Sequence, residues 1–192
     1  MDFKKGFTLV EMIVGFGLVG IVSVLVAALY FTNFKLFSNQ NTSIDVNSQN
    51  RLAIDNITNQ IRESMAVAAS CCSPTETAGS NELVLQLWPT DTNGDPTDPG
   101  ASNYDYIIYK LDSANSTITK QTVPASGISH RTSGTKVLAV SLATNGLQFT
   151  YAPDNTTPST ATEIIVSIVT TGTAAGKTQT VIQTTSATLR NK

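Results

Sequence analysis

Charged residues are scarce in this chain. Asp, Glu, Lys and Arg make up 14% of the 192 residues, and the formal net charge is −2 at pH 7. A basic face of the kind that binds nucleic acid is therefore not expected. Low charge combined with abundant Thr, Ser and Asn is typical of an extracytoplasmic β-rich domain rather than of a cytosolic enzyme.

Histidine is almost absent. The one histidine, His130, lies in a stretch rich in Ser, Gly and Thr, and no nucleophile motif accompanies it. A Ser/His/Asp site or a histidine-ligated metal site is therefore not expected. We predict that the protein is not an enzyme and needs no cofactor.

The two cysteines, Cys71 and Cys72, are adjacent, which fits neither a metal site nor a CxxC redox motif. Adjacent Cα atoms are about 3.8 Å apart, below the range of roughly 4.4–6.8 Å that is usual for disulfides. Free or intermolecular thiols are therefore favoured. A strained vicinal disulfide, formed in an oxidising compartment, is the alternative.

Proline and glycine are missing between Ile21 and Cys72, so neither residue interrupts a helix there. The run 12–31 carries no charge, and its twenty residues, at about 1.5 Å each, match the roughly 30 Å hydrocarbon core of a membrane. Lys4 and Lys5 precede the run. This order places the N-terminus in the cytoplasm and the rest of the chain outside.

A single carboxylate, Glu11, stands at the start of the apolar run, where its cost in a membrane calls for a functional reason. Residues 4–11, KKGFTLVE, resemble the class III signal of type IV prepilins and type II secretion pseudopilins. The resemblance covers the leader and the membrane segment. It implies that residues 1–6 are a leader peptide, that a prepilin peptidase cuts between Gly6 and Phe7, and that Phe7 is then N-methylated.

The same resemblance gives Glu11 a role in assembly, as the fifth residue of the processed chain. Its carboxylate would pair with the free α-amine of Phe7 on a neighbouring subunit, so the cost of the lone charge in lipid would favour assembly. The implied partners are other pilin or pseudopilin subunits, the prepilin peptidase and an inner-membrane assembly platform. The implied location is the inner (cytoplasmic) membrane, crossed once, with the C-terminal domain outside and with transfer to a filament or pseudopilus on assembly.

Two plainer interpretations of the N-terminal segment compete with this one. A cleaved secretory signal has a shorter apolar region, followed by a small-residue cleavage site that this chain lacks in a convincing form. A plain signal anchor fits the length of the run but gives no reason for Glu11.

Beyond Phe31 the apolar pattern becomes amphipathic. Apolar residues recur mostly at steps of three and four from Leu36 to Met65, and Asn and Gln fill the other face. We predict one helix from about Phe7 to about Ala69. Residues 7–31 would form its membrane and assembly segment, and residues 32–70 an amphipathic extension that Cys71-Cys72-Ser73-Pro74 ends.

From Glu82 onward the sequence predicts six or seven strands, mostly in meander order. Residues 71–192 are therefore predicted to form a β-rich domain of antiparallel sheets packed on the helix, an α+β, pilin-like lollipop. The segments that carry this prediction are 83–87, 104–111 and 116–122 around a turn at 112–115, 136–142 (strand or short helix), 147–151 after an Asn145-Gly146 turn, and 163–169 and 178–189 around a turn at 172–176.

The strand order, the stretch 145–151 and the terminal stretch 186–191 are similar to minor pilins and pseudopilins of the W or J type. In those families the minor subunits form a tip complex that primes filament assembly. The chain is accordingly interpreted as a structural, minor subunit of a type IV pilus or of a type II secretion or competence pseudopilus. The alternative is a membrane-anchored extracytoplasmic β-domain that acts as an adhesin or binding module.

The one candidate ligand site is the loop 91–98. Asp91, Asn93, Asp95 and Asp98 place side-chain oxygens around Gly94, as at the start of a calcium loop. The loop departs from the EF-hand pattern, because Pro96 follows Asp95 and no Glu stands at the twelfth position. A solvated turn fits these residues equally well.

Overall fold

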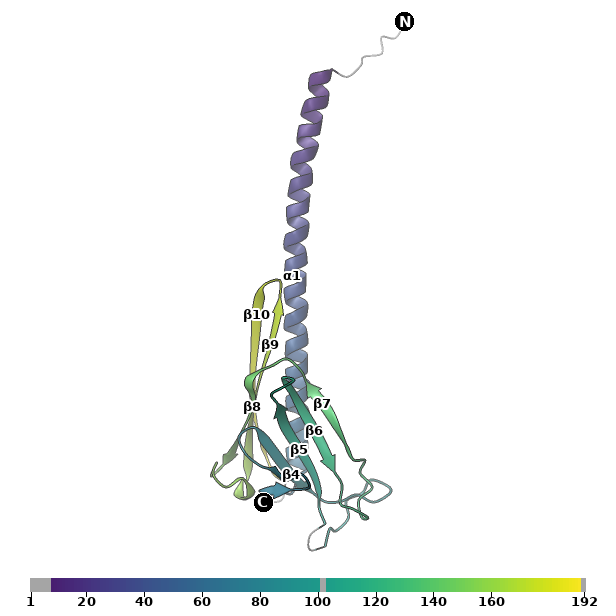
Figure 1. Ribbon diagram of the computed structural model, residues 1–192, viewed down its shortest axis with the longest axis vertical. Coiled ribbons are helices and arrows are strands. Elements are labelled where there is room, and N and C mark those ends of the chain that lie inside the picture. Colours follow the sequence, from purple (N-terminus) through teal and green to yellow (C-terminus); the bar gives the residue numbers. More distant parts are fainter. Residues whose placement is uncertain (1–7, 101–102, 191–192) are drawn as a thin grey trace.

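The computed structural model of the chain describes residues 8–100 and 103–190. One long helix, α1, projects from a β domain that packs around its C-terminal half (Figure 1). The predicted α+β lollipop is therefore confirmed. The fold explains how one helix can have an exposed apolar end and a buried amphipathic end.

Helix α1 runs over Leu9–Glu63, which are 55 residues, or about 80 Å at 1.5 Å per residue. Its large apolar side chains from Leu9 to Phe37 are exposed, and its buried residues begin at Val46. The first half of α1 thus has no partner within the described residues. The second half carries the face that the domain covers.

The helix ends six residues earlier than predicted. Ser64 caps it, and its hydroxyl donates to the carbonyl of Ile61. The backbone N–H of Met65 and that of Ala68 then donate to carbonyls of a strand in the β domain. Because the chain finds sheet partners at once, residues 64–70 leave the helix. The predicted start at Phe7 lies outside the described residues.

The strands form three antiparallel sheets. The five-stranded sheet has the order β1-β4-β5-β6-β7, the three-stranded sheet has the order β10-β9-β8, and β2 pairs with β3. Their bounds are β1 Ala66–Val67, β2 Ser70–Cys71, β3 Glu76–Thr77, β4 Glu82–Leu87, β5 Asp105–Asp112, β6 Thr117–Val123, β7 Gly134–Ala139, β8 Leu142–Ala152, β9 Glu163–Ala174 and β10 Lys177–Thr188, with a 3-10 turn at Pro158–Thr160.

Two predicted turns differ from the structure. Asn145 and Gly146 lie inside β8, where the register with β9 shifts between Leu142 and Leu147, and Asn145 has φ 55°. This stretch is an irregularity within one strand rather than a turn between two. The turn that joins β9 to β10 lies at Ala175 and Gly176, with φ of 48° and 79°.

Most of the core lies between α1 and the sheets. Ile57 and Ile61 of the helix are fully buried against side chains from both larger sheets, such as Tyr109, Phe149 and Ile164. A polar contact fixes the same packing, because the fully buried Asn50 donates from Nδ2 to the carbonyls of Ile168 and Val181 and to the hydroxyl of Thr170, each at 3.2 Å.

Candidate functional site

The N-terminus of α1 is closed by a capping box between Thr8 and Glu11. The backbone N–H and the hydroxyl of Thr8 both donate to Oε2 of Glu11 at 2.9 Å, and the N–H of Glu11 donates to the Thr8 hydroxyl at 3.3 Å. These contacts satisfy donors that would otherwise have no partner at a helix start. The one carboxylate of the apolar segment therefore has an intramolecular partner in the single subunit.

The helix behind this capping box is long and apolar enough to cross a membrane. Its most apolar 18-residue window has a mean hydropathy of 2.7, and none of that window is buried. Exposed aliphatic and aromatic side chains cover every side of this part of α1. Such a surface is stable in lipid or against other apolar helices rather than in water.

Residues 1–27 match the family model described as the prokaryotic N-terminal methylation motif. The N-terminus of this chain is a type IV prepilin-like class III signal. The match includes Gly6 and Phe7, which lie outside the described residues, together with Glu11 and most of the apolar run 12–31. Comparisons with curated proteins and with solved structures found no match. The class III signal supports a processed subunit of the pilin or pseudopilin kind.

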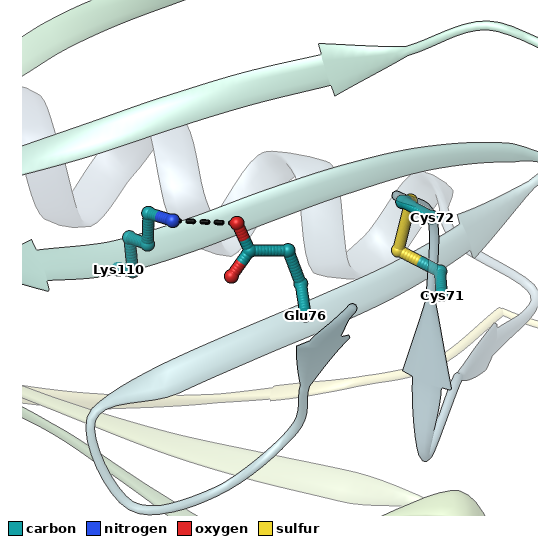
Figure 2. The surroundings of a disulfide bond; sticks show 4 residues. All are labelled: Cys71, Cys72, Glu76 and Lys110. Atoms are coloured by element: carbon teal, nitrogen blue, oxygen red, sulfur yellow. Dashed lines mark hydrogen bonds and ion pairs between the residues drawn. A yellow bond between two sulfur atoms is a disulfide. The ribbon is translucent and has the colours of Figure 1, made fainter. Parts of the chain in front are cut away.

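Cys71 and Cys72 form a disulfide with each other (Figure 2). The structure therefore has the vicinal disulfide, which was the alternative prediction, and not the free or intermolecular thiols that the sequence favoured. The Cα atoms are 3.8 Å apart, and Cys72 has φ 69°. The chain reverses direction here, between β2 and β3. The disulfide thus lies at the end of β2, where the chain turns toward β3.

Beside the disulfide, β3 and the larger sheet are joined by an ion pair between Lys110 Nζ and Glu76 Oε1 at 2.6 Å (Figure 2). This hydrogen bond to Lys110 holds the pKa of Glu76 below its ordinary value. Burial and the neighbouring carboxylate of Glu76 raise the pKa of Glu82 to about 7. The two carboxyl groups therefore differ in protonation near neutral pH.

The loop 91–98 is a closed turn. Oδ1 of Asp91 accepts from the backbone N–H of Asn93 at 2.8 Å and from that of Asp95 at 2.9 Å, and Asp98 accepts from Gly100 at 3.0 Å. The backbone hydrogen bond from Asp95 is the main cause that lowers the pKa of Asp91. Within residues 8–100 and 103–190 no group of three His, Cys, Asp or Glu side chains is arranged to hold a metal ion. The hydrogen bonds favour the solvated turn.

A buried carboxylate, Asp105, lies at the start of β5, and no sequence pattern indicated it. Its side chain is fully buried, and Oδ1 accepts from the N–H of Ala125 at 2.8 Å. Oδ2 accepts from the Ser129 hydroxyl and pairs with Arg131 Nε, both at 2.8 Å. These contacts fix the segment that connects β6 to β7.

Proposed function

We propose that the chain is a structural subunit of a type IV pilus or of a type II secretion or competence pseudopilus. The observation that supports this most is the class III signal at residues 1–27, which leads without interruption into a helix whose apolar side chains stay exposed from Leu9 to Phe37. A plain anchor needs only about 20 apolar residues. Here the exposed apolar surface extends past that length and ends where the domain begins.

In this proposal a prepilin peptidase removes residues 1–6, and Phe7 becomes the methylated N-terminal residue. The new α-amine then lies one residue before Thr8, the cap of α1. In the single subunit, among residues 8–100 and 103–190, the carboxylate of Glu11 accepts hydrogen bonds from Thr8. In the filament the Phe7 amine of a neighbour would add a positive charge, which neutralises the carboxylate among packed helices and fixes the register between subunits.

The place of action follows from the same features. The subunit waits in the inner membrane with its β domain outside, and an assembly platform extracts it into the filament. The similarity of residues 145–151 and 186–191 to W- or J-type proteins supports a minor, tip-forming role as the finer proposal. An adhesin or binding module on a plain anchor is the second candidate, which the class III signal disfavours.

Variants of Glu11 test the proposed role in assembly. Glu11→Gln keeps an acceptor for the capping box but removes the charge, whereas Glu11→Ala and Glu11→Lys remove both. We expect all three to insert in the membrane and to be incorporated into filaments much less than the wild type, because a membrane-buried amine is left without its counter-charge. Incorporation is measured by immunoblotting sheared filaments against the membrane fraction.

The matched control is Thr8→Ala, which removes the capping hydroxyl at a cost of about 1 kcal/mol but keeps the carboxylate. This variant should still be incorporated. If Glu11→Gln and Glu11→Ala enter filaments at wild-type levels, the pairing of Glu11 with Phe7 is wrong. If Thr8→Ala fails as severely as Glu11→Gln, then helix capping rather than charge explains the defect.

A further inference from the structure

Two strand edges, one of six residues and one of 12, have no hydrogen-bonded neighbour strand within residues 8–100 and 103–190. The five-stranded sheet ends at β7, and the three-stranded sheet ends at β10. The opposite edges are short or covered: β1 has two residues, and the N–H groups of Leu142 and Phe149 in β8 donate to the carbonyls of Ser116 and Ser80. Edges β7 and β10 are the ones left open to another chain.

Strand β10 lacks the features with which proteins protect an exposed edge. It has 12 residues, contains no proline, and carries a charge only at Lys177, its first residue. Protected edges are short, charged or interrupted by bulges. A long, uncharged edge on an extracytoplasmic domain is therefore expected to be covered in the functional state.

The two edges run in opposite directions along α1. Strand β10 follows the direction of the helix, since Gln179 Nε2 donates to the carbonyl of Asn39 and Asn50 donates to the carbonyl of Val181. Strand β7 runs against it, since Lys136 shares a cleft with Asn56, whereas the N–H of Val140 donates to Gln49 Oε1. Figure 1 shows β7 and β10 on opposite sides of α1.

Each open edge also carries an exposed aliphatic side chain. Val137 of β7 is 51% exposed and Ile182 of β10 is 66% exposed. Lys136 lies opposite Lys120, which donates to Gln60 of α1, so its neighbour Val137 faces away from the helix. In β10 the odd-numbered Gln179 contacts α1, so the even-numbered Ile182 also faces away from it.

We propose that β7 of one subunit pairs with β10 of a second copy of this chain, antiparallel, with Val137 and Ile182 close to each other on the outer face. In one membrane the α1 helices of two copies point the same way. Because β10 follows α1 and β7 runs against it, β7 of one copy meets β10 of the other antiparallel, whereas two β10 edges would meet parallel. The contact joins different surfaces, so it repeats from subunit to subunit as in a filament. This inference rests on the proposed function of a filament subunit and not on its finer form, because the repeated contact requires adjacent copies of the subunit, which a subunit confined to the tip would not have.

Cysteine cross-linking in membranes and filaments tests the pairing with the full chain. Two differently tagged copies are produced together, one with Val137→Cys and the other with Ile182→Cys, and mild oxidant is added. We expect a disulfide-linked dimer that contains both tags. Neither variant alone should give this dimer, because the contact is between unlike edges. The control pairs Val137→Cys with Thr150→Cys, an exposed position on β8, and should stay monomeric.

A charge exchange checks the result without cross-linking. Ile182→Asp and Val137→Lys should each reduce the recovery of the subunit in filaments several-fold, and the two together should restore it. The proposal is overturned if the mixed cysteine pair links no better than the control, if Ile182→Cys links to itself, or if it links only to a different protein. If one of these results is obtained while the wild type still forms filaments with a methylated Phe7, the strand pairing is wrong and the proposed function stands. Absence of processing and of filaments in the wild type would instead contradict the proposed function.

Discussion

Replacement of Asp105 by alanine should destabilise the β domain severely. The carboxylate is fully buried, accepts from the N–H of Ala125 and from the hydroxyl of Ser129, and forms an ion pair with Nε of Arg131, each at 2.8 Å. In Asp105→Ala all three groups lose this partner. Breaking a buried ion pair from one side costs about 3–5 kcal/mol. Because the Arg131 side chain left behind is 28% exposed, we expect the lower end of this range, which is still a large part of the stability of an ordinary domain.

Two companion variants separate charge from shape. Asp105→Asn keeps the shape and one oxygen, so its cost should be lower, about 1.5–3 kcal/mol for the lost charge-assisted hydrogen bonds. Asp55→Ala breaks an exposed pair with Arg51, whose atoms are 3.9 Å apart. Exposed pairs of this kind contribute at most about 0.5 kcal/mol, so this control should unfold almost like the wild type.

The assay is urea unfolding of the full chain in detergent, followed by fluorescence. The chain has one tryptophan, Trp88, which lines the same cavity as Arg131, so the signal reports on this end of the domain. We expect the unfolding midpoint to fall in the order Asp55→Ala, Asp105→Asn, Asp105→Ala. If Asp105→Ala loses no more than Asp55→Ala, the buried network does not hold the segment between β6 and β7.

Two further predictions concern the packing of the β domain. Burial raises the pKa of Glu82 in the folded domain to about 7, from an ordinary value of 4.5. Because the folded state binds this proton more tightly, the contribution of Glu82 to stability is full below about pH 4.5 and is lost as the pH rises through 7. Because the group is partly exposed, the loss should be only about 1 kcal/mol, and Glu82→Gln should remove it in unfolding curves at pH 5 and pH 8. A Cβ on Gly172 would lie 2.6 Å from methyl groups of Thr42 and Val46, so Gly172→Ala should destabilise the domain by about 1–3 kcal/mol. The control Gly134→Ala, whose Cβ would meet no atom within 4 Å, should cost less. Equal unfolding midpoints for the two variants would contradict the close approach of β9 to α1.

The fold was largely predictable because its signals are periodic. The uncharged run at 12–31 and the three- and four-residue spacing behind it predict α1, and alternation predicts β4 and the β5–β6 hairpin. The end of the helix was not predictable from this spacing. Residues 66–67 are apolar and helix-compatible, and only pairing with β4, made distant in sequence by the β2–β3 hairpin, turns them into a strand.

The site was predictable where chemistry depends on local order and not where it depends on contacts between distant segments. Residues 4–11 carry the class III signal within one short stretch, so no fold is needed to find it. By contrast, the Asp105 network joins residues 20 to 26 positions apart. The disulfide joins adjacent residues, so the sequence could name its two possible states but not choose between them. Asn145-Gly146, a strong hairpin signal by itself, lies within β8 because pairing with β9 continues on both sides of it.

Mass spectrometry of the mature N-terminus tests the central claim most directly. The chain is purified from membranes and from filaments of a host that has a prepilin peptidase, and its N-terminal peptide is sequenced. A chain that starts at an N-methylated Phe7 is the predicted result. A chain that keeps Met1, or one that starts near Tyr30 after cleavage behind the apolar run, would contradict the account.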